Sequence, residues 1–235
     1  MAEAGVSTCG RKSAERSRRR DLAELAIAYG LILIVIWTPR PWQRLLWWIA
    51  AGVVVFLTCV SFDGAKAMGL RATNFVRSLW VVGVALAAAA GLVAVAAHLH
   101  TLHMPHGPVF FIGTYWRYAV WTFVQQFLMQ CFFLSRLLRL LPGPKSAALA
   151  TAVLFALAHL PNPILAPVTL LWGCAACLLF LRYRNLYPLA MAHAILGISI
   201  AIAVPGPVDH NMRVGLGYLT YGHHAHHAPQ VSAQP

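Results

Sequence analysis

The sequence predicts an all-α polytopic membrane protein with about seven transmembrane helices. Of its 235 residues, 60% are hydrophobic and 10% are charged, whereas a typical soluble domain is about half apolar and about one quarter charged. The mean hydropathy is +0.67. A soluble chain of this length has too little interior to cover so much apolar surface, and the apolar residues fall in long runs. These observations place the chain among integral membrane proteins.

The apolar runs predict the helices in chain order. A membrane-spanning helix needs about 20 apolar residues. The candidate spans are residues 22–38, 45–62, 77–97, 112–138, 146–160, 164–181 and 186–204. The fifth run is short because Pro161 and Pro163 follow it, and proline interrupts a regular helix. A count of six or eight spans therefore stays open.

The first run is predicted to be an anchor helix. It follows the basic stretch SRRR and has full span length, and no small-residue cleavage site followed by a polar mature region comes after it. A secretory signal would be shorter and would end at such a site.

The basic residues are distributed unevenly between the two predicted sides of the membrane. If the N-terminus is inside, all but four of the 18 Lys and Arg residues fall on the inner side. The four on the outer side are Arg40, Arg44, Arg117 and Arg213. This bias predicts an N-in, C-out orientation. The net charge of +12 thus reflects topology signals at the ends of apolar runs, and we expect no nucleic-acid binding.

Polar side chains interrupt the apolar runs in the second half of the chain. They are Gln125, Gln126, Gln130, His159 and His193. Polar groups within a membrane are costly and are functional candidates by default. The alternative is that each side chain only hydrogen-bonds to a neighbouring helix.

The spacing of these residues gives three predicted helices one polar face each. Residues four apart share a face of a helix. The pairs with this spacing are Gln126 with Gln130, Phe155 with His159, and His193 with Gly197. We expect the three faces to converge on one cavity.

Three short motifs carry these residues: QQFLMQ at 125–130, FALAH at 155–159 and HAILG at 193–197. Their order resembles the CAAX-protease and bacteriocin-processing (CPBP) family of intramembrane endopeptidases, whose motifs are EExxxR, FxxxH and HxxxN. The stretches FFLSRLL and RYRNLYPLAMAH are also similar, and the resemblance covers about residues 115–204.

The resemblance implies a glutamate-based hydrolase in which a Glu and a His activate water. Carried over to this sequence, the catalytic residues are Gln125 at the Glu position, His159 as the partner of the water, and His193 at the oxyanion site. The supporting residues are Gln126 and Gln130 at the ion-pair positions, Phe155 in the second motif, and Gly197 at the second oxyanion position.

Two positions depart from the family pattern. A glutamine amide can orient a water but cannot accept its proton. Gly197 has no side-chain amide that could stabilise an oxyanion. None of the six acidic residues falls in the last four predicted spans; they are Glu3, Glu15, Asp21, Glu24, Asp63 and Asp209.

Three functions remain open from the sequence. The preferred one is a CPBP-type intramembrane endopeptidase that cleaves a membrane-associated, prenylated or leader peptide, with a histidine as base. The second is a catalytically inactive homologue that binds peptides or acts as a membrane maturation or immunity partner. The third is an unrelated membrane protein. The expected partners are the lipid bilayer and a membrane-associated peptide or protein, and the expected location is a bacterial-type plasma (inner) membrane.

We expect no cofactor, and no metal in the core. A metal site needs three or four ligands, and His159 and His193 supply two. The histidine-rich stretches 98–106 and 223–227 lie on the same predicted side. They either bind a divalent metal or form solvated low-complexity segments.

The chain divides into four predicted parts. They are a basic cytoplasmic tail (1–20), N-terminal transmembrane helices (21–110), a CPBP-like helical core (111–204) and a histidine-rich C-terminal tail (205–235).

Overall fold

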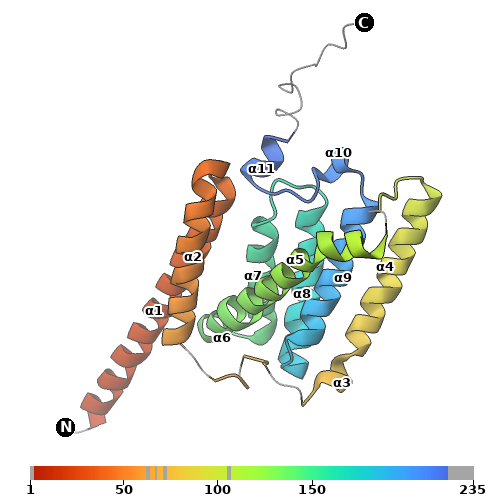
Figure 1. Cartoon of the computed structure of the whole chain (residues 1–235). Coiled ribbons are helices and arrows are strands. Elements are labelled where there is room, and N and C mark those ends of the chain that lie inside the picture. The colour runs from red at the N-terminus through yellow and green to blue at the C-terminus, as the bar shows by residue number, and fades with distance from the viewer. Residues whose placement is uncertain (1–2, 62–63, 67, 71–72, 105–106, 222–235) are drawn as a thin grey trace, which may run out of the picture.

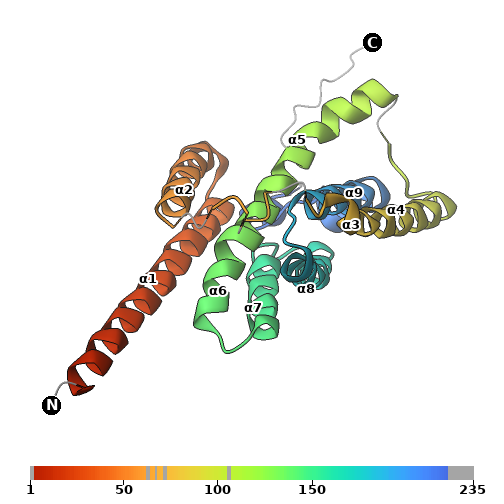
Figure 2. The same cartoon turned by 90° about the horizontal axis from the view of Figure 1, so that it is seen from below.

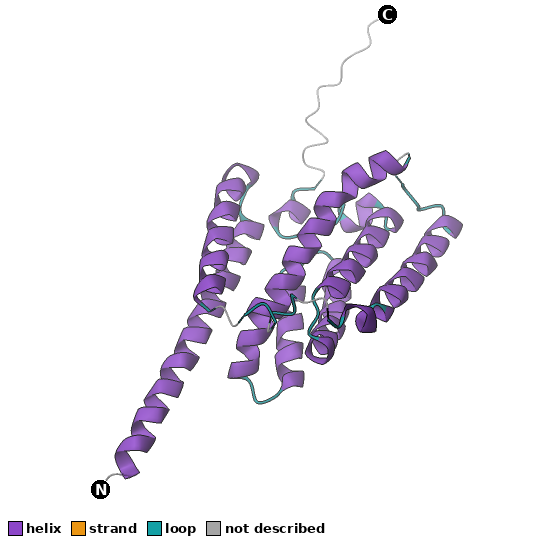
Figure 3. Cartoon of the chain, turned by 60° about the horizontal axis from the view of Figure 1, so that its bottom comes forward, coloured by secondary structure: helices purple, strands orange, loops and turns teal. Residues whose placement is uncertain are grey.

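A computed structural model gives the fold. It describes residues 3–61, 64–66, 68–70, 73–104 and 107–221. Within these ranges the regular secondary structure is helical and no residue forms a strand (Figure 3). The predicted all-α class is therefore confirmed.

The helices follow one another in the order of the apolar runs (Figure 1). They are α1 (Glu3–Trp37), α2 (Arg40–Val60), α3 (Phe75–Ser78), α4 (Trp80–His98), α5 (Pro108–Phe127), the π-helix η1 (Leu128–Leu134), α6 (Ser135–Leu140), α7 (Pro144–Leu157), α8 (Leu165–Tyr183), α9 (Tyr187–Ala203), α10 (Gly206–Asp209) and α11 (Leu216–Leu219). The segments α5, η1 and α6 are continuous in sequence and correspond to the single predicted span 112–138.

Three helical stretches of the described residues are long and apolar enough to cross a membrane: Arg40–Val60, Phe75–His98 and Leu165–Tyr183. The helices Pro144–Leu157 and Tyr187–Ala203 are apolar but shorter. The short fifth run ends at Leu157, before the two prolines. The structure thus supports a membrane protein with several apolar helices.

Helices α1 and α2 form an antiparallel pair on one side of the molecule (Figure 2). Helix α1 begins at Glu3 and ends at Trp37. The basic segment before residue 20 and the first apolar run are therefore parts of one helix. Helix α2 buries only Ala50 and Val54, while Trp48 and Phe56 are exposed. An apolar helix with so little buried surface suits contact with lipid.

The other helices form the body of the protein, and small residues allow them to approach closely. A Cβ added at Gly173 of α8 would lie 3.0 Å from the Cβ of Ala152 on α7. Such small residues are typical of packed membrane helices. Helices α4 and α5 pack against α9, and η1 contacts α7 and α8. The α5–η1–α6 segment therefore lies between the α1–α2 pair and the remaining helices (Figure 2).

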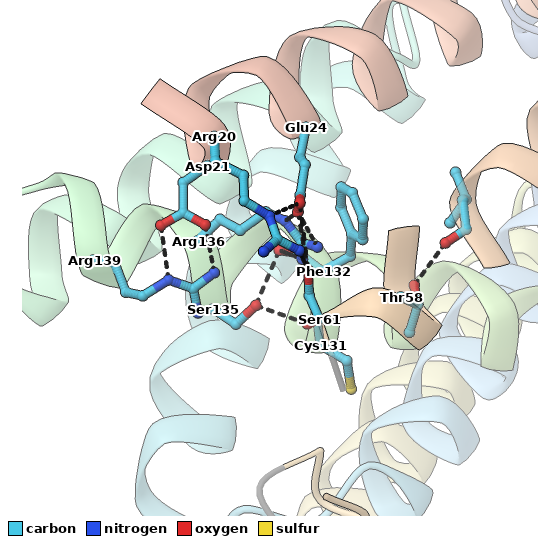
Figure 4. Close-up of polar contacts among 11 residues, drawn as sticks. Arg20, Asp21, Glu24, Thr58, Ser61, Cys131, Phe132, Ser135, Arg136 and Arg139 are labelled. Atoms are coloured by element: carbon cyan, nitrogen blue, oxygen red, sulfur yellow. Dashed lines mark hydrogen bonds and ion pairs between the residues drawn. The ribbon is translucent and has the colours of Figure 1, made fainter. Parts of the chain in front are cut away.

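A cluster of ion pairs, of which the Glu24–Arg136 pair is buried, joins α1 to α6 (Figure 4). Arg136 donates from Nε and Nη2 to Glu24 Oε2, at 2.8 and 2.6 Å. Arg139 donates to both carboxylate oxygens of Asp21, at 2.7 and 2.8 Å. Arg20 donates to the other oxygen of Glu24 at 2.7 Å. The charge bias predicts that these arginines are topology signals, and the structure shows that they also have acidic partners.

Candidate functional site

A cavity of about 250 Å³ lies among α1, α5, η1, α7, α8 and α9. Most of its walls are aliphatic or aromatic, with polar atoms at a minority of positions. This is the usual character of a small-molecule or peptide site. The side chains with polar atoms or imidazole rings are Tyr29, Tyr118, Trp121, Gln125, Thr151, His159, Thr169, Trp172 and His193.

Most of the residues singled out in the sequence lie around this one cavity. Gln125 from α5, Phe155 from α7, His159 just after α7, and His193 and Gly197 from α9 line it. Gln126 and Gln130 are buried beside it. No Asp or Glu is among its described lining residues, so no carboxylate replaces the missing glutamate there.

A chain of hydrogen bonds joins the first motif to the third. Gln130 Nε2 donates to Gln126 Oε1 at 3.3 Å, and Gln126 Nε2 lies 3.2 Å from His193 Nδ1. In the orientation assigned to these amides, Gln126 is the donor, so His193 Nδ1 accepts and His193 Nε2 carries the proton. Gln126 and Gln130 occupy the ion-pair positions of the first motif. Through these two neutral amides, the first motif is hydrogen-bonded to His193 of the third motif.

His159 carries its proton on the other ring nitrogen, Nδ1. Its Nδ1 lies 2.7 Å from the backbone oxygen of Phe155. A carbonyl oxygen can only accept, so Nδ1 carries the proton and Nε2 of the neutral ring has the lone pair. The ring of Phe155 contacts both imidazoles, with centroid distances of 4.7 Å to His159 and 5.8 Å to His193.

The π-helix η1 starts two residues after Gln126 and contains Gln130. A π-helical turn accommodates an extra residue relative to an α-helix and is frequent at functional sites. All residues of η1 from Met129 to Leu134 are buried. The last two residues of the first motif, Met129 and Gln130, therefore lie in a closely packed part of the long helix.

Two further parts of the chain close the cavity. Tyr29, Ile32 and Ile36 of α1 line it, as do Met212 and Val214 from the segment after α9. The Tyr29 hydroxyl donates to the backbone oxygen of Leu154 at 2.9 Å. The sequence motifs lie outside both of these segments.

The described residues contain no group of three or more His, Cys, Asp or Glu side chains placed to hold a metal ion. The predicted histidine-rich tail at 223–227, and His106 of the other histidine-rich stretch, lie outside the described residues.

Tyr118 and Trp172 also line the cavity, and the three sequence motifs do not include them. Tyr118 lies seven residues before Gln125, two helical turns away on the same face of α5, so its spacing was a usable signal. Trp172 lies on α8 with its ring centroid 6.0 Å from that of His193, and the short polar motifs gave no reason to select it.

A comparison with protein-family models finds a match in the second half of the chain. The family described as type II CAAX prenyl endopeptidase Rce1-like matches residues 119–198, about one third of the chain. Comparisons with curated proteins and with solved structures give no match. The matched segment begins on α5 and ends on α9, and it contains all three motifs. The resemblance to the CPBP family is therefore confirmed for the segment that carries the cavity histidines and glutamines.

Proposed function

We propose that the chain is an intramembrane endopeptidase of the CPBP type, with His159 as the general base. The observation that carries this proposal is the Nδ1 contact that each of two histidines makes at one cavity, from which complementary protonation of the two rings follows. His159 presents the lone pair of Nε2, and His193 presents an N–H at Nε2. An acceptor for the proton of water and a donor for a developing oxyanion are the two groups that peptide hydrolysis needs.

The proposed reaction needs no carboxylate. Gln125 orients a water through its amide, and His159 Nε2 takes a proton as the water oxygen attacks the carbonyl carbon. His193 Nε2–H donates to the oxyanion of the tetrahedral intermediate. The C–N bond then breaks, and His159 returns the proton to the leaving amine. A positioned general base contributes about 10²–10⁴-fold to such a step.

The family match supports a substrate that is a membrane-associated peptide. The apolar cavity walls suit the same class, because an apolar peptide loses little by leaving lipid for such a site. The proposed location is an integral position in a plasma membrane of the bacterial type.

The competing proposal is a catalytically inactive homologue that binds peptides as a maturation or immunity partner. The absence of Asp and Glu from the described cavity lining favours it. It keeps the cavity and the hydrogen-bonded glutamines but has no turnover.

Cleavage of a farnesylated CaaX-type peptide by the purified chain in lipid nanodiscs tests the proposal. A fluorophore and a quencher flank the scissile bond. We expect His159→Ala and His193→Ala each to lower the rate at least 100-fold. His103→Ala is the matched control, because His103 is exposed and does not line the cavity.

Wild-type rates in both cavity variants would contradict the proposal. Binding of the peptide by a wild-type chain that does not cleave it would favour the inactive homologue.

A further inference from the structure

At the third motif, the Tyr118 side chain occupies the space beside Gly197. A Cβ added at Gly197 would overlap the hydroxyl of Tyr118 and lie 2.7 Å from its Cζ atom. Real Cβ atoms do not approach other atoms so closely. The Tyr118 hydroxyl therefore lies in the space into which a larger residue at 197 would project its side chain.

The hydroxyl of Tyr118 is also available to donate. Four side-chain hydroxyls line the cavity, on Tyr29, Tyr118, Thr151 and Thr169. Three of them donate to backbone carbonyls: Tyr29 to Leu154, Thr151 to Ala147 and Thr169 to Leu165. The Tyr118 hydroxyl has no hydrogen-bond partner among the described residues. Its proton is thus not committed to holding a helix.

The position of Tyr118 relative to the catalytic candidates is fixed by regular helices. Tyr118 and Gln125 are seven residues apart on α5 and both line the cavity. Gly197 follows His193 by one turn of α9, and both line the same cavity. Helices α5 and α9 pack directly against each other. The hydroxyl therefore lies one helical turn along α9 from His193.

We propose that Tyr118 is the second oxyanion donor of this enzyme and replaces a side-chain donor at position 197. The inference rests on the proposed function, because a donor to an oxyanion has a role only if a carbonyl is attacked. In the proposed reaction Tyr118 O–H and His193 Nε2–H donate to the same oxygen. The hydroxyl keeps its proton throughout, since it stabilises charge and transfers nothing.

The removal of the hydroxyl tests the donor role. In the farnesylated-peptide assay, Tyr118→Phe is expected to lower kcat about 10²–10³-fold, the usual cost of one oxyanion donor, with KM changed by less than a few fold. The ring remains and no hydrogen bond to a described residue is lost, so the fold is kept. Tyr115→Phe is the control, because Tyr115 lies on the same helix and does not line the cavity.

A reciprocal pair of variants tests whether the two positions share one space. Gly197→Asn in the wild-type chain is expected to lower the melting temperature, because the new side chain meets the Tyr118 ring. In the Tyr118→Ala background the same change is expected to be tolerated and to restore part of the lost turnover. This melting-temperature comparison requires no activity.

The outcomes separate the inference from the proposed function. If the wild-type chain does not cleave the peptide, the proposed function fails and the donor role fails with it. Cleavage by the wild type but not by His159→Ala supports the proposed function. If Tyr118→Phe then cleaves at the wild-type rate, only the role of Tyr118 as oxyanion donor fails. A loss of turnover in Trp172→Phe without one in Tyr118→Phe would assign the donor to the Trp172 indole instead. Equal destabilisation by Gly197→Asn in both backgrounds would refute the shared space.

Discussion

The buried pair of Glu24 and Arg136 supports a quantitative prediction about how α1 is held. Their side chains are 7% and 3% exposed, so water cannot replace either partner. Glu24→Gln leaves the Arg136 guanidinium buried without its counter-charge. Removal of one member of such a pair costs about 3–5 kcal/mol. At about 2–4 °C per kcal/mol for a chain of this size, the melting temperature is expected to fall by about 6–20 °C.

The neighbouring pair provides a matched control. Asp21 and Arg139 are joined by two hydrogen bonds, but the Arg139 side chain is 41% exposed. Water can therefore solvate Arg139 when Asp21→Asn removes its counter-charge. An ion pair of this exposure contributes about 0–1 kcal/mol, and the expected fall is a few degrees.

Thermal unfolding of the purified variants in detergent, followed by tryptophan fluorescence, measures both shifts. The double variant Glu24→Met with Arg136→Met is expected to recover most of the loss, because replacement of both members of a buried pair by apolar residues is often neutral. Equal effects of Glu24→Gln and Asp21→Asn would show that burial does not determine the cost of removing a carboxylate, since burial is the difference between the two pairs.

Two other predictions concern the cavity and the segment beyond α9. Gln126→Leu removes the donor to His193 Nδ1 and the acceptor for Gln130. We expect the free energy of unfolding to fall by about 1–3 kcal/mol and kcat to fall as well. An unchanged rate in the peptide assay would show that this chain of hydrogen bonds has no role in catalysis. Burial raises the pKa of the Asp209 carboxyl above its ordinary 3.8, so its carboxylate form is penalised in the folded chain and its contribution to stability falls as pH rises above that value. Asp209→Asn keeps an oxygen for the Asn211 amide and is expected to raise the melting temperature at pH 7 by a few degrees and less at pH 4; no difference between the two pH values would contradict this.

The helices of the second half could be predicted because apolar runs and prolines mark them. The run 112–138 forms one continuous helical segment, and the helix before Pro161 is short. The i, i+4 spacing also anticipated which residues share a helix face, including the hydrogen-bonded pair Gln126 and Gln130. These are local properties, and the local sequence determines them.

The pairing of distant segments could not be predicted in the same way. Glu24 and Arg136 are 112 residues apart, and nothing in either local sequence indicates the partner. The π-helix η1 changes the register within an apolar run that gives no sign of it. The approach of Tyr118 to Gly197 depends on how α5 packs on α9. The sequence shows that position 197 has no side-chain donor. It does not show that the Tyr118 side chain lies in the space beside Gly197.

The relative cleavage rates of wild type, His159→Ala and Gln125→Glu decide whether the chain hydrolyses peptides with a histidine base. In the proposed reaction, His159 takes the proton of the attacking water at a cavity whose described lining has no Asp or Glu. All three chains are compared on one farnesylated peptide in nanodiscs, with products identified by mass spectrometry. We expect the wild type to cleave at least 100 times faster than His159→Ala, and Gln125→Glu to match or exceed the wild type. A wild-type rate equal to that of His159→Ala, with cleavage appearing only in Gln125→Glu, would contradict the proposed reaction and identify the chain as an inactive homologue.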